Sequence, residues 1–319
     1  MKTTTLSAED RKKRLNRITA STVAAVLGYS QWETPFSAWL DITGQSEREE
    51  NMDMALGIAL EPVLIRYAVE SLDYTDHIQP GTMLLTGFPW MAATPDALCP
   101  KEKVGVEVKN RNDHMRQFFK GSPEDAEFGN DLIPVADNMQ CQWGMLATGY
   151  DEWVFCVYFG GRDFRIYRIR RDVDLLGAMI EAAHDWWKQH VDPDGPREMP
   201  EVDGREPTRK ALTKHFGSPD KDKIAATEGH REKARRIREL DNRVKEYTEE
   251  RARLVNTLAV DIGPHIGIEG VCSYPLVTPK PSTDWKGLAQ SFSDWPKREA
   301  QHKKDRGAYR RFQLLKGVE

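Results

Sequence analysis

The stretch ATPDALCPKEKVGVEVKNR, residues 93–111, brings an aspartate, a glutamate and a lysine within fourteen positions. Its second half, VGVEVK (104–109), alternates strictly between apolar and other residues. Successive side chains of a strand point to opposite faces, so the three valines are expected on one face and Glu107 and Lys109 on the other. Such a strand can bury its valines and still aim a carboxylate and an ammonium group into one cleft.

A turn in front of this strand carries the third polar residue, Asp96. The apolar stretch FPWMAA ends just before Thr94-Pro95-Asp96, and the following loop, CPKEK, has the proline and polar residues typical of a turn. A hairpin would therefore place Asp96 beside Glu107. Two carboxylates and a lysine suit the binding of a hard divalent cation and the hydrolysis of a phosphodiester. The alternative is that Glu107 and Lys109 are a solvated pair, which is more common for an acid and a lysine on an exposed strand face.

The composition is that of a globular protein that avoids membranes. Of 319 residues, 30% are charged and 39% hydrophobic, and the sequence has no apolar run long enough to span a bilayer. The N-terminal segment lacks the apolar core of a secretory signal, so a cytoplasmic location is expected. The four cysteines form no CxxC pair, which argues against a zinc knuckle or an iron–sulfur cluster and favours free thiols.

Charge is unevenly distributed along the chain. The net charge of −4 argues against a uniformly basic nucleic-acid binder. Residues 1–20 nevertheless hold six Lys and Arg against two acidic residues, and residues 297–316 hold eight against two. These basic ends are interpreted either as solvated tails or as contacts to DNA phosphates.

Two helices are expected near the N-terminus. RITASTVAAVLG is typical of a helix capped by Thr19 or Ser21 and ended by a glycine. ETPFSAWLDITG predicts a helix with Thr34 as N-cap and Pro35 at the first helical position.

A third helical pattern covers about residues 52–72, with Pro62 inside it. Proline removes one backbone donor and should bend the helix beside Glu61. A glutamate buried at a kink is costly without a partner, and a metal ion or a neighbouring Lys or Arg would supply one. Further elements expected downstream are a helix over 134–146 that carries Gln140 and is ended by Gly149, a β-hairpin around Gly160 and Gly161, a helix over 173–190 and a linker-like stretch over 192–207.

The character of the chain changes beyond the linker. Apolar residues recur at alternating spacings of three and four along a highly charged helix, with Arg251 at one position of this stripe. Packing within the chain or as a helical hairpin is the favoured interpretation, and a two-chain coiled coil is the alternative. A β-hairpin near 266–277, a helix start at STDWKGLA and a basic tail ending in GAYRRFQL complete the chain.

Five short motifs occur in a characteristic order. They are RLNRITAS (14–21), GIALEP (57–62), TPDALC (94–99), VEVK (106–109) and NMQCQW (138–143). Together they resemble the YqaJ-type viral recombinases, which belong to the phage lambda exonuclease group of the PD-(D/E)XK nuclease superfamily. The resemblance extends over roughly residues 11–190.

The resemblance implies an α/β fold, namely a PD-(D/E)XK nuclease core with a mixed central sheet flanked by helices, plus a C-terminal helical arm. The implied organisation is an exonuclease core (1–195), a linker (196–218) and a C-terminal extension (219–319) with a long charged helix, a small β-hairpin and a basic tail. The implied setting is the cytoplasm of a bacterial host, with the protein encoded by a phage or prophage.

The resemblance also implies an activity. A member of this group digests one strand of linear double-stranded DNA from a 5′-phosphate end toward 3′, and leaves 3′ overhangs for homologous recombination. It uses Mg²⁺, for which Mn²⁺ substitutes, with two ions per site. The implied partners are a single-strand annealing protein and further copies of the chain, in a ring that is a trimer in some relatives.

Site residues carry over by position. Asp96 and Glu107 resemble the metal-binding carboxylates, Glu61 the upstream acidic ligand, and Lys109 the lysine that orients the attacking water. Other matches are the Val108 carbonyl as a further ligand, Gln140 as the helix glutamine near the site, and Arg14 and Ser21 as the residues that grip the 5′-phosphate. Thr86 stands where some relatives place another acidic residue.

Two alternatives differ in class. One is a RecB-like or Cas4-like nuclease of other polarity, although the scattered cysteines argue against its iron–sulfur members. The other is a catalytically inactive DNA-end-binding protein, against which the intact Asp96, Glu107 and Lys109 argue.

Overall fold

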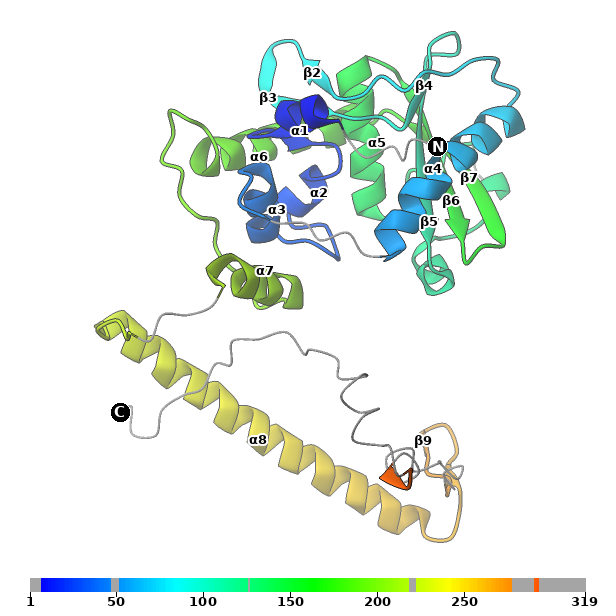
Figure 1. Ribbon diagram of the computed structural model, residues 1–319. Helices are drawn as coiled ribbons and strands as arrows, with labels where there is room; N and C mark the ends of the chain where they lie inside the picture. Colours follow the sequence, from blue (N-terminus) through cyan, green and yellow to red (C-terminus); the bar gives the residue numbers. More distant parts are fainter. Residues whose placement is uncertain (1–6, 47–51, 126, 218–221, 277–289, 293–319) are drawn as a thin grey trace. The chain divides into compact units, whose positions relative to one another are not determined.

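The computed structural model describes residues 7–46, 52–125, 127–217, 222–276 and 290–292 (Figure 1). The chain divides into two compact units, Met1–Gly217 and Ser218–Glu319. The first unit contains all the residues of the predicted nuclease site.

A four-stranded mixed sheet forms the centre of the first unit, in the order β4-β5-β6-β7. Strand β5 pairs antiparallel with β4 and parallel with β6, and β6 pairs antiparallel with β7. The predicted hairpin at Gly160 and Gly161 joins β6 to β7, and both glycines have positive φ, which glycine adopts at low cost. The predicted mixed α/β class is confirmed. The strands are β4 (Ala97–Cys99), β5 (Val104–Arg111), β6 (Glu152–Phe159) and β7 (Asp163–Arg170).

Helix α4 (Met52–Ser71) covers one face of this sheet. Leu64, Ile65 and Ala68 of the helix are buried with the three valines of β5, which confirms the alternation predicted for that strand. The helix continues on both sides of Pro62, so the proline does not end it.

Helix α5 (Val135–Thr148) and the segment before it cover the opposite face. The helix starts after Pro134 and ends at Gly149, whose φ of 73° is left-handed, in agreement with the predicted stop. The segment between β5 and α5 holds two short 3₁₀ turns, η1 (Asp113–Phe118) and η2 (Pro123–Asp125).

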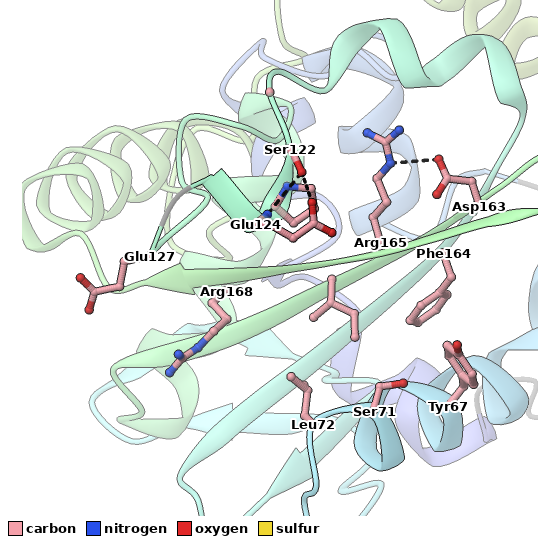
Figure 2. A pocket seen from close by; sticks show the side chains of 13 residues that line it. Tyr67, Ser71, Leu72, Ser122, Glu124, Glu127, Asp163, Phe164, Arg165 and Arg168 are labelled. Atoms are coloured by element: carbon pink, nitrogen blue, oxygen red, sulfur yellow. Dashed lines mark hydrogen bonds and ion pairs between the residues drawn. The ribbon is translucent and has the colours of Figure 1, made fainter.

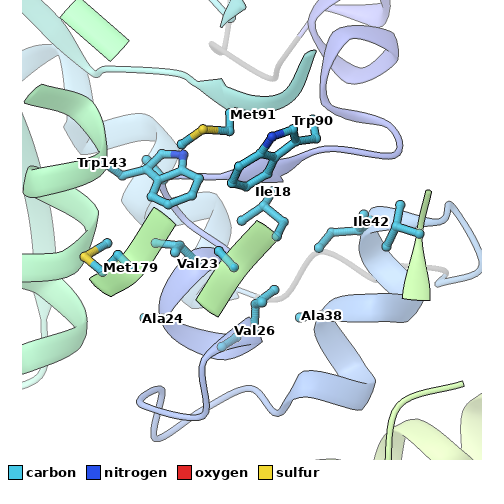
Figure 3. Packing of buried hydrophobic residues seen from close by; sticks show 14 of the residues in the cluster. Ile18, Val23, Ala24, Val26, Ala38, Ile42, Trp90, Met91, Trp143 and Met179 are labelled. Atoms are coloured by element: carbon cyan, nitrogen blue, oxygen red, sulfur yellow. The ribbon is translucent and has the colours of Figure 1, made fainter. Parts of the chain in front are cut away.

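A second, smaller sheet has the order β1-β3-β2 and packs with helices α2, α3 and α6 (Figure 3). Trp143 of α5 is fully buried in this cluster and donates from Nε1 to the Ala92 carbonyl at 3.1 Å. Helix α5 therefore belongs to both cores and fixes one sheet against the other. These elements are α1 (Ala8–Arg14), β1 (Ile18–Thr19), α2 (Val23–Val26), α3 (Pro35–Ile42), β2 (Met83–Leu85), β3 (Phe88–Ala93) and α6 (Val173–His190).

The N-terminal helix predictions had different outcomes. Helix α3 has the predicted Thr34 cap and Pro35 start, and Ser37 completes a capping box with Thr34. Helix α2 is only four residues long and follows Thr22, so neither Thr19 nor Ser21 is its N-cap. Thr19 lies in β1, where its N–H donates to the Thr22 hydroxyl at 2.8 Å and draws the segment into a turn instead of a helix.

The segment predicted as a linker over 196–218 contains helix α7 (Glu206–Phe216). The buried hydroxyl of Thr208 donates to Thr34 at 2.9 Å, and Arg205 donates to the carbonyls of Ser30 and Glu33 at 2.7 and 2.6 Å. The first unit accordingly runs to Gly217 instead of to residue 195.

The second unit contains the long charged helix, α8 (Glu228–Ile262), and a hairpin of β8 (Gly267–Ile268) and β9 (Cys272–Ser273), as predicted. Leu240, Val244 and Tyr247 of the apolar stripe are 44%, 64% and 59% exposed. The packing partner of this stripe stays a prediction. The predicted helix start at STDWKGLA and the basic tail lie outside the described residues. In the part of the chain that the structure describes, no helix combines the length and apolarity needed to cross a membrane.

Candidate active site

Strand β5 delivers Glu107 and Lys109 to the side of the sheet that α5 covers. Because the valines face α4, the alternate residues face α5. Glu107 is only 3% exposed, and the Lys109 ammonium group forms an ion pair with its Oε1 atom. The solvated-pair interpretation is therefore wrong, since this face of the strand is covered.

The β4–β5 hairpin brings Asp96 to the same place. Ala97 pairs with Val106, so the register continued by one residue sets Asp96 opposite Glu107. The Val108 N–H donates to Asp96 Oδ2 at 2.8 Å and fixes this carboxylate. The hairpin thus produces the neighbouring carboxylates that the sequence predicts.

Helix α5 contributes two further side chains one turn apart, Asp137 and Gln140. Gln140 donates from Nε2 to the same Glu107 oxygen that Lys109 contacts. Asp137 accepts from Arg111 Nη2 at 3.0 Å, two residues beyond Lys109 on β5. Residues three apart on a helix share a face. Helix α5 therefore contacts the polar face of β5 at two positions, Glu107 and Arg111.

Two glycines set the height of α5 above the sheet. A Cβ atom on Gly105 of β5 would lie 2.2 Å from the Trp153 indole, and one on Gly144 of α5 would lie 2.6 Å from it. The fully buried indole therefore fills the space that these missing side chains leave. This close approach holds the helix where Gln140 reaches Glu107.

Burial and mutual repulsion raise the pKa of all three carboxyl groups. Burial, and then the charge of Asp96, raise the pKa of Glu107 to about 8. Burial also raises the pKa of Asp96 to about 6, against an opposing effect of Lys109. The pKa of Glu61 is raised by burial and then by Glu107, so its charge acts on the same cluster.

The pKa of Lys109 is also raised, but for a different reason. Burial alone would lower the pKa of its ammonium group, but the charges of Glu107 and Asp96 outweigh burial and raise it. When ionised, the four carboxylates (Glu61, Asp96, Glu107 and Asp137) exceed the two cations (Lys109 and Arg111) by two negative charges. A cluster with this imbalance favours a further cation.

The donors of the cluster are oxygen atoms, which suit a hard divalent ion such as Mg²⁺. Within the described ranges, however, no three His, Cys, Asp or Glu side chains converge closely enough to hold a metal ion. Asp96 is held by Val108 and Glu107 by Lys109 and Gln140, while Glu61 acts on them through its charge. The residue types fit such an ion. The role of the Val108 carbonyl as a ligand stays a prediction.

Arg14 and Ser21 are hydrogen-bonded to each other near the end of β3, and their binding of a 5′-phosphate stays a prediction. Arg14 Nη2 donates to Ser21 Oγ at 2.7 Å, and Nη1 donates to the Thr94 hydroxyl at 3.3 Å. The Thr94 hydroxyl also contacts the Thr82 hydroxyl, and the backbone N–H of Thr82 donates to Asp10 Oδ1 at 2.7 Å. These bonds fix α1 beside the turn that presents Asp96.

Sequence reasoning missed Thr94, Arg111 and Asp137. Arg111 continues the alternation of Glu107 and Lys109, and Asp137 precedes Gln140 by three residues, so both periodicities were available. Their pairing depends on how α5 lies on β5, which a local pattern does not specify. Thr86, at the position where some relatives are acidic, lies in the turn between β2 and β3.

A cavity of about 660 Å³ lies elsewhere, between α4, η2 and β7 (Figure 2). Tyr67 and Phe164 meet edge to face in its wall with ring centroids 4.7 Å apart. Asp96, Glu107 and Lys109 do not line it, so the carboxylate cluster and this cavity are separate features.

Comparisons with known proteins agree with the motif order. Residues 10–151 match the model of the YqaJ-like viral recombinase domain. The uncharacterized protein YqaJ of Bacillus subtilis (strain 168) is 24% identical over 291 residues, which cover 88% of this chain and 87% of that protein.

Two solved structures are similar at low identity. An alkaline exonuclease (LHK-Exo) from Laribacter hongkongensis is 21% identical with a TM-score of 0.44, and the match covers 56% of this chain and 90% of that one. A phage related exonuclease from Haemophilus somnus 129PT is 14% identical with a TM-score of 0.40, and the match covers 56% and 96% of the two chains. The likeness to the recombinase family therefore rests on the sequence match over residues 10–151.

Proposed function

We propose that this chain, whose residues 10–151 match the model of the YqaJ-like viral recombinase domain, is a metal-dependent DNA exonuclease. The observation that carries the proposal is the buried Glu107, with Asp96 set opposite it and with Lys109 and Gln140 bonded to it. Carboxylates and a lysine in this arrangement suit hydrolysis of a phosphodiester bond.

Hydrolysis needs an oriented water, relief of charge on the phosphoryl oxygens and help for the leaving oxygen. Divalent ions held by Glu61, Asp96 and Glu107 would supply the last two. Lys109 projects from the same strand face as Glu107, where its ammonium group can orient the attacking water. Gln140 keeps the Glu107 side chain in one orientation through its bond to Oε1.

We further propose that the ions are Mg²⁺, two per site, and that Mn²⁺ substitutes. Oxygen donors alone suit both ions. The two negative charges by which the cluster exceeds its cations also favour a dication.

The proposed polarity is 5′ to 3′. Arg14 presents a guanidinium group bonded to the hydroxyls of Ser21 and Thr94, and such a fork with neighbouring hydroxyls suits a terminal phosphate. Thr94 precedes Asp96 by two residues, so a 5′-phosphate held there would lie next to the carboxylate cluster. Helix α2 adds no anion site of its own, because it has only four residues and its N-cap is Thr22 instead of Ser21.

Digestion from the 5′ end would leave 3′ overhangs, the substrate of a single-strand annealing protein. We propose such a protein as the partner and a homo-oligomer as the working form. Both proposals rest on the resemblance to the recombinases. The exposed stripe of α8 is a candidate surface for either contact.

The test uses linear duplex DNA labelled at either the 5′ or the 3′ end, with Mg²⁺ or with chelator. Release of 5′ label only with Mg²⁺ supports the proposal. Attack from the 3′ end would favour a RecB-like or Cas4-like enzyme, and end binding without digestion would favour the inactive protein. Glu107→Gln should abolish digestion and keep DNA binding, whereas the exposed control Glu127→Gln should keep both digestion and DNA binding.

Polarity is tested on duplexes with 5′-phosphate or 5′-hydroxyl ends. Arg14→Ala should slow digestion of phosphorylated ends by about tenfold or more and that of hydroxyl ends little, because a charge-assisted hydrogen bond is lost only on the first substrate. Equal slowing on both substrates would leave Arg14 as a general phosphate contact.

A further inference from the structure

Arg111 is the third charged residue that β5 presents toward α5, after Glu107 and Lys109. Its side chain is 24% exposed, so the guanidinium group is only partly covered. One nitrogen, Nη2, donates to Asp137 at 3.0 Å, and the Asp137 side chain is 10% exposed. Among the described residues, the buried Nε atom of Arg111 has no hydrogen-bond partner.

A guanidinium group carries five N–H donors in a planar fork, and the bond to Asp137 leaves most of this capacity unused. A partly buried arginine of this kind is incomplete by itself. A lysine could form the same salt bridge with Asp137, but it lacks the planar fork of donors. The unused donors therefore call for an acceptor with several oxygen atoms, such as a phosphate.

The position of Arg111 indicates which phosphate this is. It lies two residues beyond Lys109 on one strand face, a distance of about 6.6 Å along the strand. Its partner Asp137 precedes Gln140, which bonds to Glu107, by three residues on one face of α5, so the Arg111–Asp137 pair lies beside the cluster. A phosphate on Arg111 would thus neighbour the phosphate that is cleaved.

We propose that Arg111 binds the DNA phosphate immediately 3′ of the scissile one, on the strand being digested, and that Asp137 positions its guanidinium group. The inference rests on the proposed function. The terminal phosphate on the 5′ side is assigned to Arg14, Ser21 and Thr94, which leaves the 3′ neighbour for Arg111. The role of this contact is to hold the strand in register for the next cut.

The experiment measures single-turnover cleavage of 5′-phosphorylated duplexes that carry one uncharged methylphosphonate linkage. The linkage is placed at successive positions 3′ of the first scissile bond. For the wild-type protein, neutralising the adjacent phosphate should slow the first cut on the order of tenfold to a hundredfold. Neutralising phosphates several positions away should have little effect.

Arg111→Gln should be slowed by a similar factor on unmodified DNA and show no additional slowing from the adjacent neutral linkage. Arg111→Lys, which keeps the charge beside Asp137, provides a second variant if the glutamine protein does not fold, and should show a reduced but measurable linkage effect. Asp137→Asn should weaken the linkage effect as well. The control Arg162→Gln, in the exposed β6–β7 turn, should retain the wild-type profile.

Three results overturn a claim. If the adjacent neutral linkage slows Arg111→Gln or Arg111→Lys as much as wild type, Arg111 does not bind that phosphate. If wild type is slowed equally by all linkages or by none, the inference is wrong while the nuclease stands. If the wild-type protein cleaves no duplex, the proposed function itself fails, and this inference fails with it.

Discussion

Replacing Glu107 with glutamine should remove a pH-dependent loss of stability that the wild-type protein suffers before any metal binds. The pKa of Glu107 is raised from 4.5 to about 8 in the folded protein, chiefly because the group is buried. Between these two values the unfolded chain has released the proton and the folded protein retains it. Stability therefore falls as pH rises through this window and levels off above about pH 8.

The size of the effect follows from the two pKa values. With an unfolded pKa of 4.5 and a folded pKa of about 8, Glu107 alone lowers the free energy of unfolding by about 2 kcal/mol between pH 6 and pH 8. For a unit of this size, that corresponds to roughly 4–8 °C in melting temperature. Asp96 contributes less in this interval, because its folded pKa is about 6.

The measurement is thermal unfolding in chelator from pH 5.5 to 8.5, for the wild type and for Glu107→Gln. Other titrating groups affect both proteins, so the difference between the two curves isolates Glu107. We expect this difference to move by about 2 kcal/mol in favour of the variant between pH 6 and pH 8. Parallel curves would show that Glu107 is already ionised and would refute the argument. Added Mg²⁺ should then stabilise the wild type more at pH 8 than at pH 6, and the variant at neither pH.

Three further outcomes are expected. Gly144→Ala should destabilise the first unit by about 1–3 kcal/mol in urea unfolding and slow cleavage, because the new Cβ would meet the Trp153 indole at 2.6 Å. The control Gly177→Ala, in α6 with nothing within 4 Å, should not destabilise it, because alanine favours a helix over glycine. Truncation after Gly217 should leave cleavage of short duplexes intact and lower processivity or partner binding, and a chain that fails to fold would show that the second unit belongs to the core. Truncation after residue 195 should melt at a lower temperature than truncation after Gly217, since it removes the Thr208 bond to α3; equal melting temperatures would show that α7 adds no stability.

The parts of the fold that the sequence predicts are those determined by short-range chemistry. The Thr34 cap, the Gly149 stop and the Gly160-Gly161 turn each depend on a few neighbouring residues. The alternation of β5 likewise places Glu107 and Lys109 on one face, whatever covers that face. These features need no knowledge of distant contacts.

The remainder depends on tertiary packing. The turn at Thr22 shortened a helix that local propensity favours. Helix α7 lies in a stretch rich in Pro, Gly and Asp that resembles a linker, and it is held by Thr208 and Arg205 across more than 170 residues. The pairing of Arg111 with Asp137 requires α5 to cross β5 at one height, which the Trp153 contact with two distant glycines determines.

The spacing of Thr94 and Asp96 connects the choice of end to the cut itself. An extended chain advances about 3.3 Å per residue, so two residues separate their positions by about 6.6 Å. Successive phosphates of one DNA strand rise by 3.4 Å along the helix axis and more along the backbone. A terminal phosphate held by Arg14 at Thr94 would therefore leave room for only one or two nucleotides before the bond that reaches Asp96 and Glu107. Pro95 between them restricts the backbone and so limits variation in this distance. On the proposed function, the same turn that selects a 5′ end thus sets the length of the released product, and short products of uniform length are the expected consequence.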